Sequence, residues 1–134
     1  MKKITGKCFC GKISYEIIGE IKHSSICHCS GCRKASAAPA VAWITVDASS
    51  FKIIKGQLSK IRAKENEYGA CYCVGERTFC PNCGTHITFI GDNRKNEIDI
   101  TTGSIDDPDI FPPEEDHAIK EKVSWVNPFC DKKN

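Results

Sequence analysis

Three cysteines lie within the six residues Cys27-His28-Cys29-Ser30-Gly31-Cys32, and this cluster constrains the chain more than any other feature. Thiolate sulfur is a soft anionic ligand that suits Zn²⁺, with Zn–S bonds of about 2.3 Å. Because Zn²⁺ prefers four ligands, three sulfurs leave one position for water or a substrate, as in catalytic zinc sites. The spacing therefore indicates an open metal site whose ligands are Cys27, Cys29 and Cys32.

A histidine could instead close this site as the fourth ligand. His28 lies inside the cluster, but in an extended backbone alternate side chains point to opposite faces, so its two cysteine neighbours face away from it. His23, His86 and His117 are the other candidates, and any of them would give a closed structural site. Disulfides are a weaker alternative, since two cysteines separated by one residue can hardly bridge without strain.

A second pair of thiols lies in Cys80-Pro81-Asn82-Cys83-Gly84, a turn that can point backbone N–H groups at the sulfurs and stabilise thiolates. A tetrahedral site needs two further ligands. Cys8 and Cys10 would join distant parts of the chain and restrict the unfolded state strongly. Cys71 and Cys73 are nearer in sequence and would close a smaller loop. Spacing alone leaves both pairings open.

Composition and charge narrow the class of protein. A length of 134 residues fits one domain, spanning residues 1–134, and ten cysteines are an unusually large share. Lys2 and Lys3 are not followed by an apolar stretch, so we expect no signal peptide, no membrane span and a reducing cytoplasmic location. The formal net charge is only +2 and basic residues form no dense run, so no nucleic-acid partner is expected.

Short alternating and apolar segments predict a mostly β fold with many short strands. Ser30 is a candidate cap for one short helix over residues 33–38, which Pro39 would end. Trp125 is expected to pack on the sheet. The expected strands cover residues 12–17, 40–46, 51–54, 58–62, 86–90, 97–101 and 117–123.

Three cysteine motifs in a fixed order resemble those of the glutathione-dependent formaldehyde-activating family. The centromere-protein-V-like proteins share this pattern of motifs. The motifs are Cys8-x-Cys10-Gly11, Cys27-His28-Cys29-x-x-Cys32-Arg33-Lys34 and Phe79-Cys80-x-x-Cys83-Gly84. The similarity continues through residues 103–108 and to His117 and Trp125. It implies a small β-tent-type fold of short antiparallel strands stapled by two zinc ions. Cys8, Cys10, Cys80 and Cys83 match the family's structural site, and Cys27, Cys29 and Cys32 match its catalytic site.

The resemblance also implies an activity. Family members act as carbon–sulfur lyases on the adduct of glutathione and formaldehyde, S-(hydroxymethyl)glutathione, so a small-molecule thiol is the expected partner. Arg33 and Lys34 are candidates for contacting glutathione carboxylates, although such residues also form ordinary solvated helix surface. The alternatives are a lyase for a different thiol adduct and a zinc-stabilised binding module without turnover. Binding of a thiol at the open position would favour the enzyme.

Four residues depart from the family pattern. Family members often carry Gly where Ala37 stands, a change that could alter the wall of the pocket. Cys71 and Cys73 lie outside the motifs and are expected to be small buried thiols on one face of a strand, an alternative metal pair or a redox pair. Cys130, close to a polar tail, is expected to be an exposed thiol.

Overall fold

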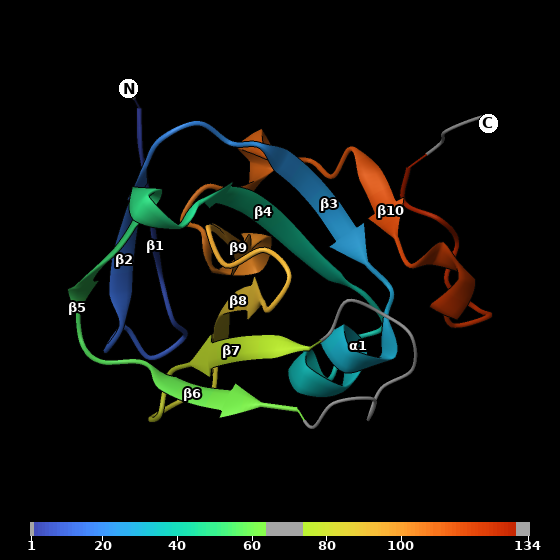
Figure 1. Cartoon of the computed structure of the whole chain (residues 1–134), viewed down its shortest axis with the longest axis horizontal. Coiled ribbons are helices and arrows are strands. Elements are labelled where there is room, and N and C mark those ends of the chain that lie inside the picture. The colour runs from blue at the N-terminus through green and yellow to red at the C-terminus, as the bar shows by residue number, and fades with distance from the viewer. Residues whose placement is uncertain (1, 64–73, 131–134) are drawn as a thin grey trace.

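The computed structural model of the chain, shown in Figure 1, describes residues 2–63 and 74–130. Within these residues the chain is mostly β, with antiparallel pairing dominant, which confirms the predicted fold class. The strands are β1 (Lys3–Lys7), β2 (Ser14–Ile18), β3 (His23–Cys27), β4 (Val41–Asp47), β5 (Phe51–Lys55), β6 (Ser59–Arg62), β7 (Gly75–Phe79), β8 (His86–Gly91), β9 (Glu97–Thr101) and β10 (Glu115–His117). The helix α1 (Ser30–Ser36) and the short 3₁₀ turns η1 (Ala48–Ser50), η2 (Thr102–Ser104), η3 (Pro108–Ile110) and η4 (Ile119–Glu121) connect them.

The strands form two sheets. The smaller sheet has the order β1-β2-β5, and the larger has the order β10-β3-β4-β9-β8-β7-β6. Figure 1 shows the small sheet on the left, with the large sheet crossing the centre toward α1 and β10 on the right. Strand β10 pairs with β3 in parallel, with His117 opposite Cys27, whereas the other strand pairs are antiparallel. The three-cysteine segment therefore lies where β3, α1 and β10 meet.

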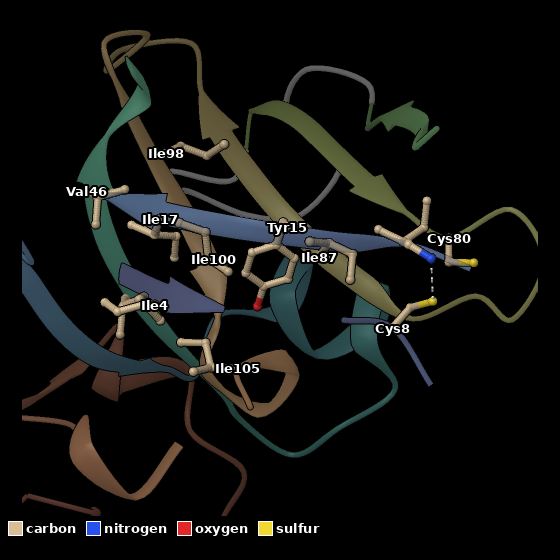
Figure 2. Close-up of a cluster of buried hydrophobic side chains, with 12 residues drawn as sticks. Ile4, Cys8, Tyr15, Ile17, Val46, Cys80, Ile87, Ile98, Ile100 and Ile105 are labelled. Carbon is tan, nitrogen blue, oxygen red and sulfur yellow. Dashed lines mark hydrogen bonds between the residues drawn. The ribbon is translucent and has the colours of Figure 1, made fainter. Parts of the chain in front are cut away.

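The main core lies between the two sheets. Figure 2 shows Tyr15 and Ile17 of β2 packed beside side chains of the large sheet, with Cys8 and Cys80 at one end. Ile17 and Ile100 are completely buried. Burying a side chain of this size contributes roughly 1.5–3 kcal/mol to the free energy of unfolding. Two of the predicted metal ligands, Cys8 and Cys80, therefore belong to the core itself.

The opposite face of the large sheet carries a different set of side chains. Because strand side chains alternate between faces, Ile44 and Val46 of β4 enter the main core, whereas Trp43 and Thr45 line a cavity on the other side. Trp43 belongs there to a buried cluster with Phe89 of β8 and the residues of the three-cysteine group. The large sheet thus separates the main apolar core on one face from a cavity on the other.

Three strands were not predicted, because their sequences lack clear apolar alternation. In β1 only Ile4 and Gly6 face inward, and the side chain of a larger residue at position 6 would overlap the Tyr15 ring. Strand β3 buries Ser24, whose hydroxyl hydrogen-bonds to backbone carbonyls of the segment before β10. Strand β7 buries Arg77. The buried glycine of β1 and the buried polar side chains of β3 and β7 conceal the apolar alternation that identifies a strand.

The predictions for the C-terminal part and for the helix cap were wrong in detail. The expected strand over residues 117–123 is β10, which ends at His117 and is followed by η4. Trp125 does not pack on the sheet, since 74% of its surface is exposed. The N-cap of α1 is Cys29, whose sulfur accepts a hydrogen bond from the Cys32 N–H, so Ser30 is the first helical residue and not the cap. Among the described residues, no helix combines the length and apolar character needed to span a membrane.

Candidate metal centres

Four thiols from distant parts of the chain meet at one end of the core. The sulfurs of Cys8, Cys10, Cys80 and Cys83 all lie within 4.8 Å of one another. The Cys10 sulfur is 3.6 Å from that of Cys8 and 3.8 Å from that of Cys80. A tetrahedral ion with bonds of about 2.3 Å requires ligand separations of roughly 3.8 Å, so this donor set fits Zn²⁺. Cys71 and Cys73, the other pairing considered, lie outside the described residues.

Tight turns place these sulfurs. Gly11 and Gly84 adopt φ of 80° and 82°, a left-handed conformation that glycine tolerates without steric cost. Backbone N–H groups point at the sulfurs, from Ile13 to Cys8 at 3.3 Å and from Cys83 to Cys80 at 3.5 Å. The Thr85 hydroxyl lies 3.2 Å from the Cys83 sulfur, and this hydrogen bond is the main cause that lowers the pKa of Cys83 to about 5. At Cys83 the environment thus favours thiolate, the form that binds metal.

A second group of three thiols forms around the start of α1. Cys27 ends β3, Cys29 caps the helix and Cys32 lies in its first turn, and their sulfurs are within 4.8 Å of one another. Cys29 and Cys32 are almost fully buried. Hydrogen bonds from Cys27 and Cys32, together with the nearby charge of Arg77, lower the pKa of the Cys29 thiol to about 2. The same contact with Cys29 raises the pKa of Cys27. Although its contact with Cys27 acts in the opposite direction, the contact with Cys29 and burial raise the pKa of Cys32 to about 11. The three sulfurs are a soft donor set, and as thiolates they would suit a zinc ion.

The histidines do not complete this group. All four are among the described residues, and none places a ring nitrogen with the three sulfurs. The His28 ring turns toward β10, where its Nε2 lies 2.7 Å from Oδ1 of Asp116. His86 Nδ1 lies 3.0 Å from the Ser36 hydroxyl. His23 and His117 line the neighbouring cavity, and His117 pairs with Glu115. The arrangement leaves one side of the three-sulfur group open.

That side faces a cavity of about 660 Å³, and all three cysteines line its wall. This volume is within the range of about 300–1,000 Å³ that is common for small-molecule sites. The aromatic rings of Trp43 and Phe89 line its inner part, whereas Arg94 and Lys120 bring positive charge to it. Arg94 is held by two carboxylates of β9, Glu97 at 3.2 Å and Asp99 at 2.8 Å. A polar ligand of small-molecule size therefore has both apolar and charged partners beside the sulfurs.

Comparison with known proteins agrees with this geometry. The sequence profile of the family described as "Glutathione-dependent formaldehyde-activating enzyme" matches residues 3–121. The chain belongs to this family. It is also 32% identical over 99 residues to an uncharacterized lyase of Schizosaccharomyces pombe, a match that covers 72% of this chain and 64% of the relative. The chain therefore spans somewhat less than two thirds of the length of that relative.

A solved structure shares the fold. The crystal structure of a Rhodobacter sphaeroides protein matches with a TM-score of 0.61 and 18% sequence identity, covering 76% of this chain and 87% of that one. Together with the profile match, this likeness places the two sulfur groups on a scaffold shared with other proteins.

The two cations predicted to contact carboxylates do not line the cavity of this family member. Arg33 donates from Nε to the His28 carbonyl at 3.2 Å and from Nη2 to the Glu121 carbonyl at 3.4 Å. Lys34 is exposed and borders a separate cavity of about 430 Å³. The cations that line the larger cavity are Arg77, Arg94 and Lys120. Sequence reasoning missed them because no motif marks them.

Two further residues differ from expectation. Ala37 ends α1 with φ of 51° and ψ of 43°, a left-handed conformation that favours glycine, which accounts for the Gly often found there in the family. It is exposed and does not line the cavity. Cys130 is half-buried rather than exposed, with its thiol 3.4 Å from the Pro113 carbonyl and its N–H bonded to Asp116. This contact fixes the last described segment beside β10.

The burial of His86 predicts a dependence of stability on pH. Desolvation, aided by the charge of Arg77, lowers the pKa of His86 from 6.5 to about 4. The unfolded chain therefore binds this proton more tightly, and the free energy of unfolding falls as the pH drops through 6.5 toward 4. We expect His86→Gln to lose roughly 1–2 kcal/mol less stability than the parent between pH 7 and pH 5. Urea unfolding of both zinc-loaded proteins at pH 7 and pH 5 measures this difference. An equal change in the free energy of unfolding with pH for the two proteins would contradict the prediction.

Proposed function

We propose that the protein is a zinc-dependent carbon–sulfur lyase that acts on the adduct of glutathione and formaldehyde. The observation that carries the proposal is the group formed by Cys27, Cys29 and Cys32, which opens into a cavity of small-molecule size. The family description names glutathione and formaldehyde, and the relative from S. pombe is named a lyase. These names support the substrate and the reaction class. The four-sulfur group at the core is proposed to hold a second, structural zinc ion.

The residues of the cavity would divide the work of binding and orienting the substrate. The three sulfurs would hold the ion, and zinc bound there would favour the thiolate form of a thiol substrate. Trp43 and Phe89 shield the inner cavity from water. Lys120, on the cavity wall, is the cation we assign to a glutathione carboxylate, since Arg94 is already paired with Glu97 and Asp99. Charge-assisted contacts of this kind fix orientation as well as affinity.

Glutathione and formaldehyde together supply every atom of the adduct. In the direction of synthesis the thiol sulfur bonds to the carbon of formaldehyde, and the proton that the thiol loses ends on the former carbonyl oxygen. In the lyase direction the carbon–sulfur bond breaks, the hydroxyl proton leaves and the sulfur regains a proton. No oxidant or reductant is required. The protein has to bring the thiol and the aldehyde together and to favour the thiolate.

The test is the rate at which glutathione and isotope-labelled formaldehyde interconvert with their adduct, measured by exchange NMR. Thiols add to formaldehyde unaided, so the expected result is exchange faster than the protein-free rate. A variant without Cys29 should give the protein-free rate, while Cys130→Ser, which lies outside the cavity, should behave as the parent. Glutathione binding without faster exchange would favour a binding module. Faster exchange only with another thiol would change the substrate.

A further inference from the structure

Arg77 lies in the middle of β7, where a buried arginine is unusual. Only 5% of its surface is exposed. In the sheet it pairs with Phe89 of β8 on one side and with Ile61 of β6 on the other. Its guanidinium carbon is 4.5 Å from the centre of the Phe89 ring, a cation–π distance. The ring orients the guanidinium but does not neutralise its charge.

The three-cysteine group lies directly against this charge. Both terminal nitrogens of Arg77, Nη1 and Nη2, are 3.8 Å from the Cys32 sulfur. Within residues 2–63 and 74–130, Arg77 forms no ion pair with a carboxylate, and the cavity acids Glu97 and Asp99 are engaged by Arg94. A buried charge without a partner is strongly unfavourable. The guanidinium is thus positioned for a thiolate cluster.

The same side chain also forms part of the cavity wall. Its charge therefore acts both on Cys32 and on a ligand that enters beside the sulfurs. Three thiolates around Zn²⁺ leave one net negative charge, and a fourth thiolate would raise it to two. A neutral fourth ligand adds no negative charge. A fixed cation inside a poorly solvated site consequently favours the thiolate more than the neutral ligand.

We propose that Arg77 is a positioning residue that makes the open three-cysteine site select an anionic thiolate over a neutral fourth ligand. The inference rests on the proposed thiol-binding function and deepens it, since it assigns the selectivity of that site to one side chain. It predicts that removing the charge weakens the binding of thiols in general, including thiols that carry no carboxylate. The effect is separate from recognition of the rest of glutathione.

The experiment uses protein with cobalt in the three-cysteine site, whose visible bands report the fourth ligand. Parent, Arg77→Gln and Arg77→Lys proteins are titrated with 2-mercaptoethanol, which has no carboxylate, and with imidazole, which binds as a neutral ligand. Replacing groups that surround a metal site typically costs about 10–100-fold in affinity. We expect Arg77→Gln to weaken 2-mercaptoethanol binding by about that factor and to leave imidazole binding little changed. Arg77→Lys should recover most of the loss, because it keeps the charge.

Arg62→Gln is the matched control. Arg62 lies on the neighbouring strand β6, and its guanidinium is paired with Asp92 at 2.6 Å, away from the sulfurs. The Arg62→Gln protein should bind 2-mercaptoethanol and imidazole as the parent does. If Arg77→Gln does not fold, Arg77→Met, which keeps the packing over Phe89, takes its place, and the melting temperature verifies that each variant is folded.

Two results would overturn the inference while leaving the proposed function intact. Equal losses for 2-mercaptoethanol and imidazole, or no loss for either, would show that Arg77 acts only through packing. Failure of Arg77→Lys to recover thiol binding would also show that the charge of Arg77 is not what favours the thiolate. In both cases the parent still binds thiols, so the proposed function stands. A parent protein whose cobalt bands respond to imidazole but to no thiol would overturn the proposed function together with this inference.

Discussion

Replacing Cys80 by serine is expected to unfold the zinc-loaded domain at temperatures at which the parent protein is stable. Cys80 is completely buried, belongs to the main core, and its sulfur faces those of Cys8 and Cys10. The four-sulfur group joins the end of β1 to the turn between β7 and β8, so removing one ligand detaches two distant segments. Structural zinc typically contributes about 10–16 kcal/mol of binding free energy, comparable with the whole stability of a small domain.

Thermal unfolding of reduced, zinc-loaded protein measures the effect, and we expect the melting temperature to fall by more than about 10 °C. Cys8→Ser should behave in the same way. The matched control is Cys130→Ser, because serine can still donate to the Pro113 carbonyl. Cys71→Ser and Cys73→Ser are also expected to cost much less. A larger loss for Cys71→Ser or Cys73→Ser than for Cys80→Ser would show that the ligands are paired differently.

The sequence predicted the elements whose physical signal is local. Strands β4, β8 and β9 carry apolar residues on the face toward the core, and their positions were close to those expected. The cysteine motifs were equally visible, because sulfur ligands must be grouped in short turns. Local spacing could not decide between Cys8 with Cys10 and a nearer pair as partners of the Cys80 turn. That choice depends on the contact between strands far apart in the chain.

The cavity could not be predicted for a related reason. Its wall combines residues of β3, β4, β7, β9 and the segment after β10, and only the folded sheet brings them together. Arg77 and Arg94 appear in the sequence as ordinary charged residues. Arg77 gains its role from a long-range contact with Cys32. Arg94 pairs with Glu97 and Asp99, which are close to it in sequence, and only the folded sheet places this group on the cavity wall. Arg33 and Lys34 were chosen because they follow a motif, and proximity in sequence did not place them at the cavity.

Replacing Cys29 by serine is expected to abolish thiol binding at the three-cysteine site while the domain remains folded. The fold should survive because the four-sulfur site and the main core are untouched, and because serine is a favourable N-cap whose hydroxyl can accept the Cys32 N–H. The site itself should fail, since two remaining sulfurs cannot hold the ion as three do. We expect the affinity for metal to fall by at least about 10–100-fold, and thiol binding to disappear with the metal.

The measurement is a titration of cobalt-substituted protein with glutathione, followed by the visible ligand-field bands. The bands should shift in the parent and should not respond in Cys29→Ser. His28→Ala provides the contrasting variant. The His28 ring is completely buried and bonded to Asp116, so its loss should lower the melting temperature but leave the metal in place. If His28→Ala instead strips the metal, and the parent bands respond to no thiol, then the site is closed and structural, and the protein is a zinc-stabilised binding module rather than a lyase.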